Sequence, residues 1–356
     1  MSAMYSQSKK SKNSGSAVKS RYAYGTARVH AMKVKLFPKE TYTKLLNMSL
    51  AEITRFIEES EYKAEVDELA RTYSGIDLVE FATHLNLART FTKLIDMTLG
   101  EPHDLIVEYL RRWDIWDIKT ILRGKMYGAS DEEIQRILVP SGELSPEYLQ
   151  TLVRRPSVED VITALKGTVY HDVIKGFDYA ESSMKVEDEL DKFYFARMLD
   201  LVSKIRGSAL YLTVIKMEID VVNLKTLFRI KNADISSSRA ADYVIPGGLY
   251  LSDKEIEKMA AAPFDEFVTL LSKYRYWGAI SDLVTERMAS LSKIELRLDK
   301  YLNEHVWQIA IFNPLTVLPM LGYMLSKDTE VDNIQAIVRG KEAGLSTEII
   351  KDHLIL

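Results

Sequence analysis

The sequence contains no cysteine among its 356 residues, which excludes disulfides, thiol nucleophiles, cysteine-ligated zinc and iron–sulfur clusters. Residues that make tight turns are also few, with 16 glycines and 9 prolines. Alternation of apolar and polar residues is scarce, and apolar residues mostly recur at intervals of three and four, as in Ile53, Phe56 and Ile57. These features predict an all-α fold held together by amphipathic helix faces.

Acidic residues are absent from the first 39 positions, where nine residues are basic. The rest of the chain carries 38 basic and 51 acidic residues, a net charge of −13, which argues against a nucleic-acid binder. Residues 1–20 are rich in serine and lysine and have almost no large apolar side chain, so burial cannot offset the entropy lost on ordering. We expect a disordered basic tail there, with no signal peptide or membrane anchor.

The familiar motifs of catalysis and cofactor binding are missing. The pairs Gly124-Lys125 and Gly340-Lys341 lack the preceding glycine loop that would hold a phosphate. None of the six histidines is three or four residues from another, so no histidine-based metal site is indicated. The serine-hydrolase elbow is absent as well. The sequence therefore predicts neither a catalytic residue nor a cofactor.

One uncharged segment, residues 306–326, is long enough to cross a bilayer. It contains Asn313 followed by Pro314, a pair that predicts a helix start with Asn313 as N-cap and Pro314 as the first helical residue. Two buried helices therefore fit this segment better than a membrane span, and the chain is expected to be soluble.

Five further helix starts are indicated by a hydroxyl residue that precedes a carboxylate by three positions. These pairs are Ser49 with Glu52, Ser130 with Glu133, Ser157 with Asp160, Ser252 with Glu255, and Thr329 with Asp332.

An internal repeat is the most informative feature of the sequence. The block 114–125, DIWDIKTILRGK, recurs at 220–231 as DVVNLKTLFRIK and at 330–341 as EVDNIQAIVRGK. A second block, which ends at a tyrosine, recurs at spacings of 108 and 106 residues, with Tyr62, Tyr170 and Tyr276 as its last residues. The chain is therefore predicted to contain three similar helical modules, at 21–140, 141–247 and 248–356, arranged as an approximately threefold body.

Nine residues of the repeated block are candidate site residues because they recur in all three copies. They are Asp117, Asn223, Asn333, Arg123, Lys125, Arg229, Lys231, Arg339 and Lys341. In a structural interpretation, the Asp or Asn caps a buried helix start and the basic residues complement the C-terminal end of the helix. In a functional interpretation, the basic residues face acidic groups of a partner. Both interpretations can hold in part.

Two weaker candidates are acidic or aromatic. Asp114 with Asp117, and the acidic segment 187–191, would be the ligands of a magnesium-dependent all-α enzyme, although the first pair recurs with Asn in place of the second Asp. Trp113 and Trp116 lie beside two arginines, but an acidic body repels phosphate, so both are predicted to be core residues.

The sequence resembles the C subunit of the archaeal A-type and related bacterial V/A-type ATP synthases, a family similar to the d subunit of V-ATPases. The resemblance runs from about Tyr22 to Leu356 and rests on four segments. They are YAYGTARVHA at 22–31, YLRRWDIWDIKTILRGK at 109–125, NLKTLFRIK at 223–231 and EVDNIQAIVRGKEAGL at 330–345. The basic tail before Tyr22 departs from the short beginning that is usual in the family.

This resemblance implies a funnel-shaped, three-part helical protein with a central cavity, whose modules surround a pseudo-threefold axis. It would link the central shaft of a rotary ATP synthase to the proteolipid rotor ring and transmit torque during proton- or sodium-coupled ATP synthesis. Catalysis would belong to other subunits. The chain would be a peripheral protein at the cytoplasmic face of the cell membrane, with membrane contact only through the rotor ring. A helical scaffold unrelated to an ATPase is the first alternative, and the magnesium-dependent enzyme is the second.

Overall fold

The computed structural model describes residues 22–177, 179–205, 207–233, 243–284 and 290–356. The regular elements of this part are α-helices, as the sequence predicts. Residues 22–33 form a first helix. The helices that follow are α2 (Lys39–Asn47), α3 (Leu50–Glu58), α4 (Lys63–Leu69), α5 (Gly75–Asp96), α6 (Glu101–Tyr127), α7 (Asp131–Ile137), α8 (Pro146–Val153), α9 (Val158–Ala164), α10 (Val169–Ile174), α11 (Tyr179–Lys204), α12 (Ala209–Asn232), α13 (Asp253–Ala261), α14 (Phe264–Leu271), α15 (Trp277–Ile280), α16 (Leu291–Phe312), α17 (Leu318–Glu342) and α18 (Thr347–Lys351).

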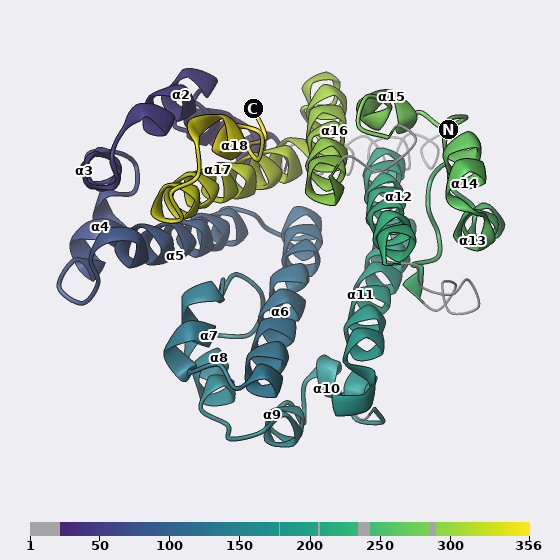
Figure 1. The fold of residues 1–356 in the computed structure, drawn as a ribbon, viewed down its shortest axis with the longest axis horizontal. Helices are drawn as coiled ribbons and strands as arrows, with labels where there is room; N and C mark the ends of the chain where they lie inside the picture. Colours follow the sequence, from purple (N-terminus) through teal and green to yellow (C-terminus); the bar gives the residue numbers. More distant parts are fainter. Residues whose placement is uncertain (1–21, 178, 206, 234–242, 285–289) are drawn as a thin grey trace, which may run out of the picture.

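The six long helices pack in a closed cycle. Helix α5 packs on α6, α6 on α11, α11 on α12, α12 on α16, α16 on α17, and α17 returns to α5. Three pairs in this cycle combine a helix that carries the repeated block with a neighbour that carries none: α6 with α11, α12 with α16, and α17 with α5. The same kind of helix pair therefore occurs three times around the cycle (Figure 1).

The short helices extend each of these pairs. Helices α7 to α10 follow α6, and helices α13 to α15 follow α12. The third set is divided between the two parts of the chain that are most distant in sequence, because α18 and α2 both pack on α17 and on each other. Figure 1 shows α2, in purple, beside α18, in yellow.

A separate hydrophobic cluster joins these distant segments. Tyr42, Leu45 and Ile53 from α2 and α3 are buried together with Ile334 and Ile350 from α17 and α18. The burial of apolar side chains from both segments supplies the free energy that closes the cycle. The division into modules at residues 140 and 247 stays a prediction, and this cluster shows that the last predicted module packs directly on the first.

Four of the five predicted helix starts are confirmed. The side chains of Ser49, Ser130, Ser157 and Ser252 each accept a hydrogen bond from the backbone N–H three residues later. The fifth prediction is wrong, because Thr329 lies inside α17 and its hydroxyl donates to the carbonyl of Leu325 at 2.8 Å. An intrahelical acceptor satisfies a threonine hydroxyl as well as a cap does, so the spacing alone cannot separate the two cases.

The segment at 306–326 forms the end of α16 and the start of α17, so the prediction of two helices is confirmed. The prediction that both are buried is wrong for the end of α16, where Ile311 and Phe312 are 62% and 83% exposed. The details differ, because Asn313 ends α16 and its side-chain amide donates to the carbonyl of Ile309 at 2.8 Å. Helix α17 begins four residues after Pro314, at Leu318. In the described part of the chain, no helix is long and apolar enough to span a membrane.

Candidate functional site

The first acid of each repeated block lies in the interior of its helix and is buried. Asp114 accepts hydrogen bonds from the backbone N–H groups of Glu143 and Leu144, both at 2.9 Å, and from the hydroxyl of Tyr170 at 2.6 Å. We call this arrangement an acid–tyrosine clasp. The acid therefore satisfies donors from a loop and a tyrosine elsewhere in the chain.

The clasp occurs three times. Asp220 accepts from the hydroxyl of Tyr276 at 2.8 Å, and Glu330 accepts from that of Tyr62 at 2.7 Å. The three tyrosines are the last residues of the second repeated block. Their pairing with the acids was not predicted from the sequence. Gly142 supports the first clasp, since a Cβ atom there would lie 2.0 Å from a carboxylate oxygen of Asp114.

The expectation that Asp117, Asn223 and Asn333 cap a helix start is wrong, because they lie inside α6, α12 and α17. Each binds a second backbone segment, 22 residues further along the chain. Asn223 accepts from the N–H of Ile245 and donates to its carbonyl, both at 2.8 Å, and Asn333 binds Ile355 in the same way. Asp117 accepts from the N–H of Val139 at 2.8 Å, while its second oxygen is buried with no partner in the described part of the chain. Burial raises the pKa of Asp117 well above its usual value, and the neighbouring Asp114 adds to the increase.

The repeated arginines connect each block helix to its neighbour in the cycle. Arg123 pairs with Glu187 on α11, Arg229 pairs with Glu295 on α16, and Arg339 pairs with Glu80 on α5. One turn earlier there is a second polar contact in each pair of helices. These contacts are Lys119 with Asp191, Lys225 with Asp299, and Gln335 with His84.

The repeated lysines bind short helices and their ends. Lys125 pairs with Asp131 at 2.6 Å, Lys231 donates to the carbonyls of Ala260 and Ala262, and Lys341 donates to the carbonyl of Leu46 at 2.9 Å. All nine predicted site residues therefore make contacts within the chain. Contact between any of them and a partner stays a prediction.

A cavity of about 500 Å³ lies inside the cycle of long helices, lined by side chains from α5, α6, α12, α16 and α17. Three residues that line this cavity occupy equivalent positions of the repeat, separated by its offsets of 106 and 110 residues. They are Arg112 on α6, Glu218 on α12 and Asp328 on α17. The inner faces of the three block helices therefore meet at one space. These positions precede the repeated block by two residues, which is the signal that could have identified them from the sequence.

The electrostatics of this central cavity are asymmetric. Arg112 pairs with Glu218, and Lys225 pairs with Asp299. On α17, Asp328 and Asp332 both line the cavity one helical turn apart. By surface area Asp328 is half-buried and Asp332 is exposed to the cavity. Desolvation by the surrounding walls raises the pKa of both carboxyls, with Asp332 adding to the increase at Asp328 and Asp299 adding to that at Asp332.

The prediction that both tryptophans are core residues is wrong for one of them. Trp113 is half-buried and lies 6.3 Å from the ring of Phe91. Trp116 lines the central cavity with 46% of its surface exposed. The two residues are three apart and lie on the same side of α6, so both line the cavity, and Trp113 also packs on Phe91.

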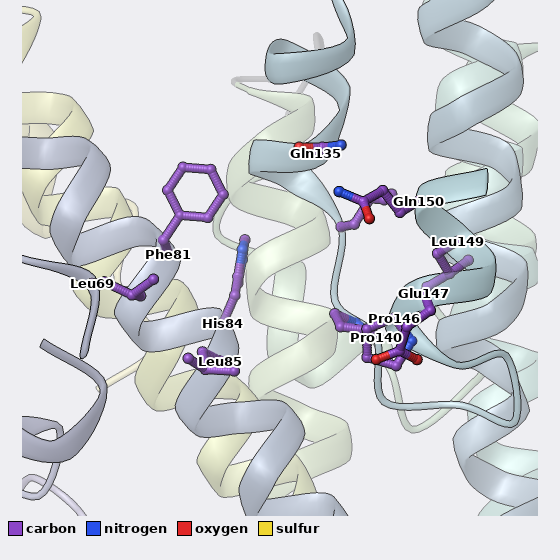
Figure 2. A pocket seen from close by; sticks show the side chains of 11 residues that line it. Leu69, Phe81, His84, Leu85, Gln135, Pro140, Pro146, Glu147, Leu149 and Gln150 are labelled. Carbon is purple, nitrogen blue, oxygen red and sulfur yellow. The ribbon is translucent and has the colours of Figure 1, made fainter. Parts of the chain in front are cut away.

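A second cavity of about 320 Å³ lies between α5 and the segment around α7 and α8 (Figure 2). Its walls are mostly apolar, with Phe81 and Leu85 from α5 facing Pro140 and Leu149. His84 lines both this cavity and the central one. Burial, with a smaller contribution from Arg339, lowers the pKa of His84 to about 4.

The magnesium hypothesis finds no support in the described residues. They contain no group of three or more His, Cys, Asp or Glu side chains placed to hold a metal ion. Asp114 is instead occupied by its two backbone donors and a tyrosine.

Comparison with known proteins identifies the family of this chain. The family model described as ATP synthase (C/AC39) subunit matches residues 26–353. The chain belongs to this family. It is also 48% identical to the C subunit of the A-type ATP synthase of Methanococcoides burtonii, over 97% of this chain and 96% of the relative.

Further relatives carry the same description. The C subunit of Methanosarcina mazei is 46% identical over 95% of this chain and 93% of its own length. That of Archaeoglobus fulgidus is 37% identical over 94% of this chain and 96% of its own. The predicted family resemblance is therefore confirmed, and the chain is a subunit of an A-type ATP synthase.

Proposed function

We propose that this subunit is the non-catalytic adaptor between the central shaft of the ATP synthase and the proteolipid rotor ring, and that it transmits torque during proton- or sodium-coupled ATP synthesis. The observation that supports this role is the closed cycle of three repeated helix pairs around a cavity, in a chain of the ATP synthase (C/AC39) family. Close-packed helices deform little under load, which suits a part that passes rotation from one partner to another. In this proposal the three modules form a funnel around a pseudo-threefold axis.

An exposed apolar surface gives the adaptor a candidate contact with the rotor ring. Leu99, Ile311, Phe312 and Leu315 are 77%, 62%, 83% and 46% exposed, and they lie in or beside the α5–α6 and α16–α17 connections. Helix 22–33 links these connections, because a Cβ atom at its Gly25 would meet Thr98 and the hydroxyl of Thr26 donates to the carbonyl of Pro314 at 2.6 Å. We name Leu99, Ile311, Phe312 and Leu315 the apolar tip.

Exposed apolar side chains grouped in this way are typical of a protein or membrane interface. A tip that docks on the rotor ring places the subunit at the cytoplasmic face of the membrane as a peripheral protein, with membrane contact only through that ring. The described part of the chain has no helix that spans a bilayer, so in this role a partner supplies the attachment.

Reconstitution tests the proposal. The purified chain is mixed with the isolated central-shaft subunits, or with membranes that hold the rotor ring, and co-sedimentation is measured. We expect stoichiometric binding to each partner and no ATP hydrolysis by the chain alone. Failure of the folded chain to bind either partner would refute the adaptor role and favour an unrelated helical scaffold.

A matched pair of variants locates the rotor contact. Leu315→Ser lies in the apolar tip, and Leu345→Ser removes a side chain of nearly equal exposure, 45%, beyond the end of α17. We expect the first variant to lose binding to rotor-ring membranes by about tenfold and the second to bind as the unmodified chain does. Equal binding by both variants would exclude the tip as the contact.

A further inference from the structure

A third cavity, of about 340 Å³, lies between α15 and α16, two helices that pack on each other (Figure 1). Three cations line it: Arg275, just before α15, and Arg297 and Lys300 on α16. A single acid, Glu304, lines it as well. The chain beyond its first 39 residues has a net charge of −13, so an excess of positive charge at one cavity runs against its overall balance. We call this cavity the basic pocket.

The charges of the basic pocket are only weakly compensated within the described part of the chain. Arg275 forms no ion pair there and donates to the neutral hydroxyl of Tyr250 at 2.8 Å. Arg297 lies 3.3 Å from a carboxylate oxygen of Asp282, but the two side chains are 49% and 59% exposed, so water screens this pair. Lys300 donates to a backbone carbonyl oxygen at 2.6 Å. An anion that enters the pocket therefore meets cations with little to give up.

The internal repeat shows that helix packing does not require the two cations on α16. Helices α16, α11 and α5 are equivalent, because each carries the glutamate that pairs with a repeated arginine. Arg297 and Lys300 follow that glutamate by two and five residues. The same positions on α11 hold Glu189 and Lys192, which pair with each other at 3.0 Å, and on α5 both hold apolar residues.

The third cation is also specific to this copy. Arg275 directly precedes the clasp tyrosine of α12, and the residues in front of the other two clasp tyrosines are Val169 and Glu61. The clasps of α6 and α17 therefore form with an apolar or an acidic residue at this position. All three cations gather in one of three similar units, at positions where the other two units fold without an excess of positive charge.

The side chains of the basic pocket suit a phosphate group. A guanidinium presents a planar set of N–H donors that matches phosphate oxygens, and a terminal phosphate offers three strong acceptor oxygens to several cations at once. The contact with Tyr250 holds the guanidinium of Arg275 in place, which reduces the entropy lost on binding. The wall at Gly278 leaves room, since a Cβ atom there would meet no atom within 4 Å.

We propose that Arg275, Arg297 and Lys300 form a binding site for a phosphate group, carried either by a soluble phosphate compound or by a lipid headgroup. On binding, Arg297 exchanges its exposed contact with Asp282 for the phosphate. This site is separate from the central cavity and from the apolar tip, and the inference does not rest on the adaptor role.

Two probes test the proposal with the full chain. Isothermal titration calorimetry measures the binding of inorganic pyrophosphate, and co-sedimentation measures binding to phosphatidylcholine vesicles with and without phosphatidylglycerol, both at about 0.15 M ionic strength. We expect Arg275→Gln with Arg297→Gln to bind the effective probe at least about tenfold more weakly than the unmodified chain. The matched control is Arg71→Gln with Arg155→Gln, which removes two exposed arginines that do not line the pocket, and we expect it to bind normally.

The outcomes distinguish the two sources of phosphate. Pyrophosphate binding that only the pocket variant loses would support a soluble ligand, and the same loss confined to phosphatidylglycerol vesicles would support a headgroup. Binding of neither probe, or equal binding by the pocket variant and the control, would overturn the proposal. A glutamate-rich peptide that binds more tightly than both probes would also overturn it, because it would assign the pocket to an acidic protein segment.

Thermal unfolding provides an independent readout and shows whether the variants are folded. Both arginines of the pocket variant are exposed, so without a probe its unfolding midpoint is expected to match that of the control. An effective soluble probe should raise the midpoint of the unmodified chain and of the control but not that of the pocket variant, because a ligand stabilises only the state that binds it. An equal rise in all three forms would place the bound probe elsewhere and contradict the proposal.

Discussion

The clasps of α6 and α17 both join an acid to a tyrosine, but very different lengths of chain separate the two residues. Asp114 and Tyr170 are 56 residues apart, whereas Glu330 and Tyr62 are 268 residues apart. The cations differ as well. Arg111 beside the first clasp pairs with Glu108 and Glu143. Lys327 in the other clasp pairs, within the described residues, with Glu330 alone, and its ammonium lies 2.9 Å from the hydroxyl of Tyr62.

The clasp of α12 shows which parts of this arrangement are essential. Its position equivalent to Arg111 and Lys327 is Met217, so this clasp has an acid and a tyrosine but no cation at that point. The acid–tyrosine bond is therefore the common element, and the buried lysine is an addition that makes the α17 clasp more dependent on its acid.

The largest effect is expected when that acid is removed. Glu330→Ala leaves the ammonium of Lys327, which is 4% exposed, without its anion. Breaking a buried pair in this way costs about 3–5 kcal/mol in the free energy of unfolding, measured by urea denaturation at pH 7. We expect Asp114→Ala to cost less, about 2–3 kcal/mol, because Arg111 keeps Glu108 and Glu143.

A double variant sharpens this prediction. Lys327→Met with Glu330→Gln removes the buried cation and its anion together while leaving an amide oxygen to accept from Tyr62, and we expect it to recover most of the stability that Glu330→Ala loses. A double variant as unstable as Glu330→Ala would show that the lysine is itself required.

The next effect concerns the contact between α17 and α5, where Gln335 and His84 take the place of the ion pairs found in the other two helix pairs. The pKa of His84 is lowered from 6.5 to about 4, so the folded state binds fewer protons than the unfolded state between these values. Its contribution to stability is present above pH 6.5 and is lost as the pH falls toward 4, by up to about 3 kcal/mol. We expect His84→Gln to flatten this part of a stability-against-pH curve, and an unchanged slope would contradict the assignment.

A smaller effect of opposite sign is expected at Asp117. The other two copies have Asn here, which both accepts from and donates to the same backbone residue. Asp117→Asn would supply the missing donor, so we expect a gain of about 1 kcal/mol at pH 7 in chemical denaturation.

The pH dependence provides the control for this variant. Because the pKa of Asp117 is raised in the folded state, its carboxyl favours folding at low pH, and this contribution is lost as the pH rises through the raised pKa. The loss should be absent from Asp117→Asn. A variant that is less stable than the unmodified chain at every pH would rule out the missing-donor explanation.

The smallest effects are expected from the repeated arginines. The side chains of Arg123, Arg229 and Arg339 are 50%, 59% and 52% exposed, so water screens their ion pairs. We expect each substitution to Ala to lower stability by less than about 1 kcal/mol in thermal denaturation. A variant that keeps its stability but loses binding to the shaft or the rotor ring would instead support the predicted partner contact.

The repeat and the helix starts could be predicted because they are local. A serine with a carboxylate three residues later acts within one turn, and four of these five predictions are confirmed. The repeated blocks were also correctly placed on helices, since their apolar spacing is that of one helix face.

The pairing between blocks could not be predicted in the same way. Tyr62, Tyr170 and Tyr276 are equivalent in sequence, so nothing local determines which acid each of them binds. The structure pairs Tyr62 with Glu330 at the far end of the chain, which depends on how whole helices pack. The exposure of Trp116 was missed for a related reason, because an apolar side chain beside a cavity looks like a core residue when only its neighbours in sequence are known.

The joint cluster of α2, α3, α17 and α18 also determines when the molecule can finish folding during its synthesis. The apolar side chains of Tyr42, Leu45 and Ile53 are made among the first sixty residues, but Ile334 and Ile350, which cover them, leave the ribosome almost three hundred residues later. At roughly 5–20 residues per second, that early surface waits for tens of seconds without its cover. The nascent chain is therefore vulnerable to aggregation throughout this period, and a folding helper that binds this early segment would shield it until synthesis is complete.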